Sequence, residues 1–254
     1  MKKYRGVFIK NSNEITLMRE ANRLVALALD ALEEAVKPGV TTMSFERIAR
    51  DFCDRHNVRP AFLGYLGFPF ALCCSVNEEV VHGFPSGRIV REGDIVSFDM
   101  GVVYQGFFGD SARTVAVGRL QPDVQKLLDV TSESLVKGIE AAAIGNDLNA
   151  IGIAVQRYVE GHGFSVIRRF VGHGIGRSLH EKPEIPNYRI AGLTALPLQE
   201  GMVLAVEPMV ATGTYEVDIL DDGWTAVTRD RGMSAHFEHT IAITHNGPEI
   251  LSLP

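Results

Sequence analysis

Apolar residues recur at helical spacing in two segments near the start of the chain. Within residues 14–36 they stand three or four positions apart, and Pro38-Gly39 ends the pattern. A second amphipathic pattern covers residues 44–56. After a stretch rich in Gly and Pro, apolar segments typical of strands occupy residues 89–117. The first part of the chain is therefore predicted to form two helices followed by strands.

The same order of patterns returns further along the chain, where helical spacing covers residues 124–139 and 148–158. The segment REGDIVSFD, which ends at Asp99, matches QEGMVLAVE, which ends at Glu207. Amphipathic helices resemble one another easily, so the helices alone leave a chance similarity open. The matched acids favour an internal duplication.

A duplicated unit predicts a single domain over residues 1–254, built from two related halves at about 13–120 and 121–254. Strands from both halves are expected to join in one antiparallel sheet with the helices covering one side, which is an α+β fold. The other face is expected to carry polar residues where the halves meet. Clefts between related halves are common ligand sites.

Three carboxylates interrupt apolar strand patterns: Asp99 in IVSFDMG, Glu207 in MVLAVEPMV and Glu238 in AHFEHTIAIT. A buried, ionised carboxylate is costly unless a cation or hydrogen bonds compensate its charge. One metal cluster would compensate several of them together. With Asp110 and His173, these acids form a set of candidate metal ligands.

The geometry of the first two acids follows from a predicted hairpin. If the residues at 105–106 form a two-residue turn, Asp99 lies opposite Ala112, and Asp110 falls on the same face, diagonal to Asp99. Two carboxylates in this arrangement repel each other unless a cation lies between them. The alternative is a pair of acids that accept backbone hydrogen bonds near a turn.

Three histidines are candidates for roles beside a metal. His173 and His180 stand in the glycine-rich segment FVGHGIGRSLHEKP, and His82 stands in EVVHGFP. A lone histidine is more often structural, but the acids elsewhere in the chain favour a functional interpretation for these three. The chain has no HExxH motif, so it does not follow the pattern of zinc proteases whose ligands share one helix.

Composition and charge indicate the class of protein and its cellular compartment. The chain of 254 residues is 46% hydrophobic and 22% charged, as in ordinary globular proteins, and its net charge of -6 offers no basic surface for direct nucleic-acid binding. The odd count of 3 cysteines favours reduced thiols. The N-terminus lacks the apolar core of a signal peptide, and no segment has the uncharged length of a membrane span. These features predict a cytoplasmic protein.

Several longer segments resemble one known family and stand in its order: VNEEVVHGFP, GDIVSFDMGVVYQGFFGDSARTVAVG, VGHGIGRSLHEKP, EGMVLAVEPMV, DDGWTAVTRD and SAHFEHTIAIT. With them the chain resembles the type I methionine aminopeptidases of peptidase family M24, in their short bacterial form, from about Asn13 to Leu253. The resemblance implies the pita-bread fold. Because no metal-binding N-terminal extension precedes the first predicted helix, the compact form is expected.

The resemblance also implies a centre of two divalent metal ions. Asp99 would bind one ion, Asp110 and Glu238 would bridge both, and His173 and Glu207 would complete the second. Ligation by oxygen and nitrogen without thiolate suits Co, Mn, Fe(II) or Zn, and affinity order alone does not select among them.

The catalytic and substrate-binding residues are likewise implied by the resemblance. His82 and His180 would contact the substrate and stabilise the reacting centre, and Glu207 would act as a proton shuttle. The methionine pocket would consist of Phe62, Tyr65, Phe68, Cys73, Leu179 and Trp224. Familiar bacterial members carry Cys in place of Phe62, Tyr in place of Phe68 and Phe in place of Leu179. Tyr65 and Phe68 also fit a purely structural role as core aromatics.

The activity implied is removal of the initiator methionine from nascent proteins whose second residue is small. The expected partners are nascent polypeptide N-termini near the ribosome, for a monomer that binds neither nucleic acid directly nor membranes. Two alternatives are a proline-directed peptidase of the same fold and an inactive pita-bread binding module. The complete ligand set argues against the module, and the short segment before the first helix argues against the proline peptidase. Since the chain starts Met1-Lys2, it is not expected to process itself.

Overall fold

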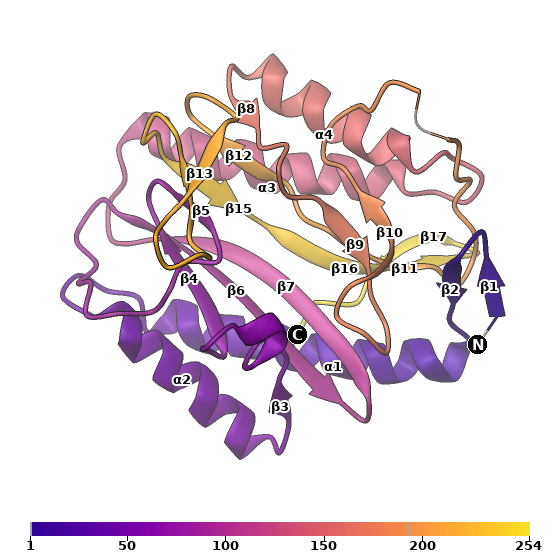
Figure 1. Ribbon diagram of the computed structural model, residues 1–254, viewed down its shortest axis with the longest axis horizontal. Coiled ribbons are helices and arrows are strands. Elements are labelled where there is room, and N and C mark those ends of the chain that lie inside the picture. The colour runs from indigo at the N-terminus through magenta and orange to yellow at the C-terminus, as the bar shows by residue number, and fades with distance from the viewer. Residues whose placement is uncertain (1, 193) are drawn as a thin grey trace.

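The computed structural model describes residues 2–192 and 194–254, so the expectation about Met1 lies outside the described residues. Figure 1 shows two pairs of long helices, one along the bottom and one along the top of the view, and both pairs pack on the same face of one curled sheet. The helices are α1 (Ser12–Glu34), α2 (Thr42–Arg55), α3 (Pro122–Ala141) and α4 (Asn149–Gly161), with a short 3-10 turn at Tyr65–Gly67.

The first two helices begin slightly before the ranges predicted from apolar spacing. At α1 the side chain of Asn11 accepts a hydrogen bond from the Glu14 backbone N–H, and the Glu14 carboxylate accepts one from the Asn11 N–H. This capping box begins the helix with polar residues, which apolar periodicity does not register. At α2 the first residue, Thr42, is buried because its hydroxyl bonds with the backbone of Ser86.

Within the described residues, a 9-stranded antiparallel sheet has the order β10-β9-β11-β16-β7-β6-β3, with β17 beside β16 and β4 beside β6. Its strands are β3 (Arg59–Pro60), β4 (Leu72–Val76), β6 (Ile95–Tyr104), β7 (Phe107–Ala116), β9 (Gly172–Gly174), β10 (Glu181–Ile185), β11 (Val203–Val206), β16 (Glu238–Thr244) and β17 (Gly247–Ile250). Strands from both parts of the chain thus share one sheet, as the duplication predicts.

Smaller sheets complete the fold. One contains β8 (Ser165–Val166), β12 (Met209–Ala211) and β15 (Ser234–His236), and another contains β5 (Glu79–Val81), β13 (Val217–Ile219) and β14 (Ala226–Thr228). An N-terminal hairpin pairs β1 (Lys2–Tyr4) with β2 (Val7–Ile9).

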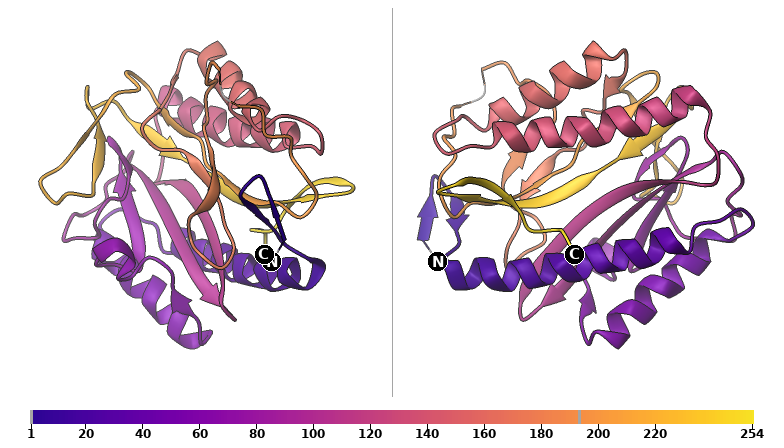
Figure 2. Two further views of the ribbon diagram at one scale, coloured as in Figure 1. Left: turned by 45° about the vertical axis from the view of Figure 1, so that its right-hand side comes forward. Right: turned by 180° about the vertical axis from the view of Figure 1, so that it is seen from behind.

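Each of the two parts of the chain contributes one pair of helices, just as each contributes strands to the sheet. In Figure 1, α1 and α2 run along the bottom of the molecule and α3 and α4 along the top, and Figure 2 shows the sheet with both pairs from two further sides. The first helix pair buries its apolar face against β4 and β6, and α3 packs near β11 and β16. Each helix pair therefore covers its own part of one sheet, in agreement with the predicted α+β class.

The predicted hairpin is confirmed in detail. Strands β6 and β7 are joined through Gln105 and Gly106, whose φ angles of 48° and 80° are those of a type I′ turn. This turn pairs Asp99 with Ala112. The central strand contact that joins the two parts of the chain is between β7 and β16, where Ala112 lies opposite Glu238.

Candidate metal centre

One cavity of about 190 Å³ is lined by all the residues that the sequence analysis assigned to a site. Its walls consist of Phe62, Tyr65, Leu66, Phe68, Cys73, His82, Asp99, Asp110, His173, Leu179, His180, Glu207, Trp224 and Glu238. Leu66 is the wall residue that the sequence analysis did not name. The structure therefore brings the predicted residues together, while their individual roles stay predictions.

Adjacent strands supply the polar end of this cavity. Asp99 lies on β6, Asp110 on β7, Glu238 at the first position of β16, Glu207 directly after β11 and His173 on β9. These strands are consecutive neighbours in the sheet. Since side chains at paired positions project to the same face, the row Asp99, Ala112, Glu238 brings acids from distant segments together.

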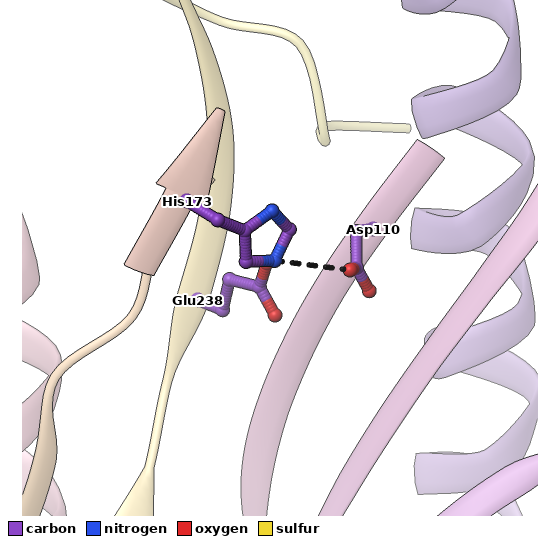
Figure 3. A group of neighbouring side chains, drawn as sticks. All are labelled: Asp110, His173 and Glu238. Carbon is purple, nitrogen blue, oxygen red and sulfur yellow. Dashed lines mark ion pairs between the residues drawn. The ribbon is translucent and has the colours of Figure 1, made fainter. Parts of the chain in front are cut away.

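The polar groups stand at distances that suit a shared cation. His173 Nε2 lies 3.7 Å from Asp110 Oδ2 and 3.6 Å from Glu207 Oε1. Figure 3 shows the side chains of His173, Asp110 and Glu238 pointing toward one another, and one ligand atom from each of the three lies within 4.8 Å of the others. These separations exceed those of good hydrogen bonds. Ligand atoms around one ion stand roughly 3 to 4 Å apart, because each metal–ligand bond is about 2 Å long.

Buried oxygens without partners point to the same interpretation. Among the described residues, Asp99 Oδ1, Asp110 Oδ1 and Glu238 Oε1 are fully buried and have no hydrogen-bond partner. An unsatisfied buried acceptor costs about 1 to 3 kcal/mol, and more when it is charged. Three such oxygens around one cavity fit a divalent metal, which would satisfy all of them at once.

The pKa values of the acids and of His173 reflect their burial in this cavity. Burial raises the pKa of Asp99 to about 7 and that of Glu207 to about 8. Burial, followed by the neighbouring acids, also raises the pKa values of Asp110 and Glu238 well above their ordinary range. Burial lowers the pKa of His173 to about 3, which keeps its imidazole neutral, the form that binds metals. A bound cation would reverse the carboxylate shifts, because it favours their ionised form.

We predict that the metal-free protein loses stability as the pH rises from about 6.5 to about 8. The folded-state pKa values of Asp99 and Glu207 lie above their ordinary values, so the stability that their protonated forms contribute is lost as the pH rises through about 7 and about 8. The lowered pKa of His173 acts in the opposite sense only below its ordinary value of 6.5.

Thermal unfolding of metal-free and metal-loaded protein across this range measures the effect. The melting temperature of the metal-free form should fall, and its difference from the loaded form should widen with pH. Glu207→Gln should weaken the trend, whereas the exposed acid change Glu249→Gln should leave it unchanged. A metal-free melting temperature that is constant or rises from about pH 6.5 to about pH 8 contradicts the prediction.

The sequence analysis missed His236, which lies next to the cluster. Its side chain is fully buried on β15, and its Nε2 atom stands 3.6 Å from Glu207 Oε2 and has no hydrogen-bond partner within residues 2–192 and 194–254. Burial lowers the pKa of His236. Alternation in the segment SAHFEHTIAIT was the available signal, since His236 stands two positions before Glu238 and such residues share a strand face.

The remaining cavity wall is apolar and aromatic. Phe68 packs edge to face against Trp224, with ring centroids 5.1 Å apart. Phe62, Cys73 and Leu179 are buried in the same apolar cluster. Cys73 and its neighbour Cys74 point to opposite faces of β4, as expected for adjacent strand residues, so Cys74 joins the core beside α1 and α2.

Two of the predicted histidines stand between the polar and the apolar end. His180 Nδ1 and Tyr65 Oη are 2.7 Å apart, and the His180 ring lies 4.3 Å from that of His173. His82 has a φ angle of 60°, which is uncommon for a residue other than Gly, and its ring lies edge to face with Trp224 at 6.1 Å. Burial, followed by His236 and His180, lowers the pKa of His82 to about 4. Both imidazoles therefore lie at the boundary between the metal-ligand candidates and the aromatic wall.

The helices of the described residues lack the combination of length and apolar character that a bilayer span requires. This finding agrees with the sequence, which contains no uncharged segment of that length.

Comparison with known proteins gives consistent matches over nearly the whole chain. The model of metallopeptidase family M24 matches residues 16–245. A methionine aminopeptidase of Clostridium perfringens is 51% identical over 97% of this chain and 99% of its own length. The crystal structure of methionine aminopeptidase from Rickettsia prowazekii superposes with a TM-score of 0.95 at 43% identity, covering 97% of this chain and 100% of that one.

A more distant likeness concerns the fold alone. Prolidase from Pyrococcus furiosus superposes with a TM-score of 0.79 at 22% identity, and the match covers 97% of this chain but 65% of the prolidase. The curled antiparallel sheet with its helix pairs is therefore the pita-bread fold that the sequence predicts.

Proposed function

Because the chain belongs to metallopeptidase family M24, we propose that its buried acids and His173 hold the metal with which it removes N-terminal methionine from peptides and nascent proteins. The chain is a metal-dependent aminopeptidase, because it matches methionine aminopeptidases at up to 51% identity over nearly their full length. The observation that carries the proposal is the set of unpartnered carboxylate oxygens beside His173 in a cavity whose other end is apolar.

We infer a centre of two divalent ions. Asp99 would bind one, Asp110 and Glu238 would bridge both, and His173 and Glu207 would complete the second. Four carboxylates and a neutral imidazole supply more donor atoms than one ion uses, which supports this assignment. The chemistry that such ions supply is activation of water and polarisation of the scissile carbonyl. Oxygen and nitrogen donors suit Co, Mn, Fe(II) or Zn.

The side chains around the metal ligands have separate proposed tasks. Glu207, which a bound cation would hold in its ionised form, would take up a proton from the attacking water and deliver it to the departing amine. His180 and His82 would donate hydrogen bonds to the substrate as negative charge develops on its carbonyl oxygen. Both need a ring N–H for this task, and a neutral imidazole provides one.

The apolar end of the cavity would accept the methionine side chain. Phe62, Tyr65, Phe68, Cys73, Leu179 and Trp224 form this part of the wall. An unbranched thioether packs well against aromatic rings, with sulfur contacts worth up to about 1.5 kcal/mol each. The cavity of about 190 Å³ is small, which favours a single side chain over a longer peptide segment.

Turnover of Met-Ala-Ser and Gly-Pro by the purified protein with each candidate metal tests the function. We expect cleavage of Met-Ala-Ser and none of Gly-Pro. Cleavage of Gly-Pro alone would favour the proline-directed alternative. Failure to cleave either peptide with any metal would favour a binding module.

We further predict a preference for small second residues. Peptides starting Met-Ala should be cleaved at least about 100-fold faster than those starting Met-Lys. A lysine side chain would meet the rim of the cavity, which we expect to include His82-Gly83-Phe84. It would have to bury its charge or displace this rim, at a cost of several kcal/mol. Parallel measurement of kcat/KM for Met-Ala and Met-Lys peptides of equal length decides the matter. Equal rates would show that the rim is open.

We also propose the compartment, oligomeric state, partners and domain organisation of the enzyme. We expect a cytoplasmic monomer that acts on nascent N-termini near the ribosome without direct nucleic-acid or membrane contact. The buried, free thiols of Cys53, Cys73 and Cys74 support a reducing compartment. We propose one catalytic domain over residues 1–254 with halves at about 13–120 and 121–254. The sheet that strands of both halves share supports this division.

A further inference from the structure

We propose that Lys10, which lies outside the cavity, is a positioning residue for His180. It acts through a buried ion pair with Glu181, the residue that follows His180. This inference rests on the proposed function, since it assigns Lys10 a role in the reaction to which His180 contributes.

The ion pair is short and sealed from solvent. Lys10 Nζ lies 2.8 Å from Glu181 Oε2, and the exposed fractions of the two side chains are 0% and 3%. The chain also contains ion pairs that link α1 to remote segments at the surface, such as Arg19 with Glu249, whose side chains are 45% and 42% exposed. Because the pair is buried, removing either partner leaves an uncompensated charge away from water, whereas the loss of an exposed pair costs little.

Glu181 connects this pair to the loop that carries His180. Its Oε1 atom accepts hydrogen bonds from the backbone N–H groups of Arg177, at 2.8 Å, and Ser178, at 3.3 Å. The Glu181 carboxylate therefore holds the two ends of the loop over residues 177–181 together. With Oε2 engaged by Lys10, both oxygens of Glu181 are used.

Close packing prevents the loop from shifting. At Gly176 an added Cβ atom would stand 2.6 Å from Glu181 Oε1 and 2.7 Å from Lys10 Cε. The two side chains thus pass directly beneath the backbone at the start of the loop. The N–H of Phe108 on β7 donates to the Gly176 carbonyl at 2.9 Å, which fixes this backbone on its other side.

Lys10 is itself firmly held. Its backbone N–H donates to the Gly201 carbonyl at 2.8 Å, and its Nζ atom also donates to the Phe8 carbonyl at 3.3 Å. Gly201 stands just before β11, the strand that leads to Glu207. Lys10 therefore ties the His180 loop to the same part of the sheet that holds the metal-ligand segment.

The position of His180 depends on this arrangement. Its ring contacts Tyr65 through Nδ1 and stands beside His173, so a small movement of the loop changes both contacts. A displacement of about 1 Å in a catalytic group lowers the rate by up to about 100-fold. Without Lys10, the buried Glu181 carboxylate would lack its cation, and the loop would move to expose it to water.

Steady-state kinetics of Lys10→Met with Met-Ala-Ser tests the proposal. We expect kcat to fall about 10- to 100-fold while bound metal and the circular dichroism spectrum stay normal. Lys10→Arg, which keeps the charge, should recover most of the activity. Arg19→Met, which removes the exposed ion pair with Glu249, is the matched control and should behave like the unchanged protein.

A double variant separates positioning from general destabilisation. If Lys10 acts through His180, adding Lys10→Met to His180→Ala should lower kcat by less than about 2-fold further. The full single-variant loss in the His180→Ala background would overturn the proposal, as would normal kcat in folded Lys10→Met. If Lys10→Met does not fold, Glu181→Gln serves in its place with the same expected outcomes.

The proposed function can fail separately. In that case the unchanged protein would not cleave Met-Ala-Ser, or His180→Ala would leave kcat normal.

Discussion

Asp110→Ala and Glu238→Ala are each expected to abolish peptide turnover, by at least about 1000-fold, and to lose at least one bound metal ion. Each carboxylate is buried near His173 and carries an oxygen that has no hydrogen-bond partner in the part of the chain that the structure describes. In the proposed centre of two ions, loss of a bridging ligand would leave both ions incompletely coordinated, so neither the nucleophile nor the carbonyl would be activated. Elemental analysis of bound metal beside kcat/KM for Met-Ala-Ser measures both effects.

Matched variants separate the charge of these acids from the space that they fill. Asp110→Asn keeps the size of the side chain and removes its charge, and it should lose metal almost as completely as Asp110→Ala. Glu249→Ala changes an exposed acid on β17, next to β16 in the same sheet, and should retain metal and activity. Near-normal metal content and turnover in Asp110→Ala or Glu238→Ala would remove the assignment of a dinuclear centre.

The second large effect is expected from His180→Ala, which should lower kcat about 100- to 1000-fold while both metal ions stay bound. The His180 ring lies against that of His173, but its Nδ1 atom is engaged by Tyr65 Oη. It is thus placed to donate to a substrate from its other nitrogen. Metal analysis and kcat measured on the same preparation distinguish this role from ligation.

Two other histidines of this chain provide a control and a parallel test for this prediction. His56 is the C-cap of α2, stacks on Phe52 and does not line the cavity, so His56→Ala should retain full activity. His82→Asn should reduce kcat in the manner of His180→Ala, since Asn tolerates the positive φ angle at this position. If His180→Ala instead emptied the metal site, the roles of His180 and His173 would be exchanged.

Local features of the sequence were sufficient to place several of the candidate metal ligands. The turn at Gln105–Gly106 and strict strand alternation determine that Asp99 lies opposite Ala112, and both depend only on neighbouring residues. Acids within apolar strands likewise indicate a compensating cation without knowledge of the fold. The pocket is different: Phe62 and Leu179 could be named only through the family resemblance, because apolar residues lining a pocket have the same pattern as core residues.

Tertiary structure alone decided which distant segments meet. The pairing of β7 with β16 places Glu238 beside the acids of the first hairpin, and no turn connects these strands to set their register. The same holds for His236 beside Glu207 and for Lys10 beside Glu181, a pair separated by 171 positions. The physical reason is that local propensities and periodicity fix which face a residue occupies, whereas packing of the entire apolar core determines which faces come into contact.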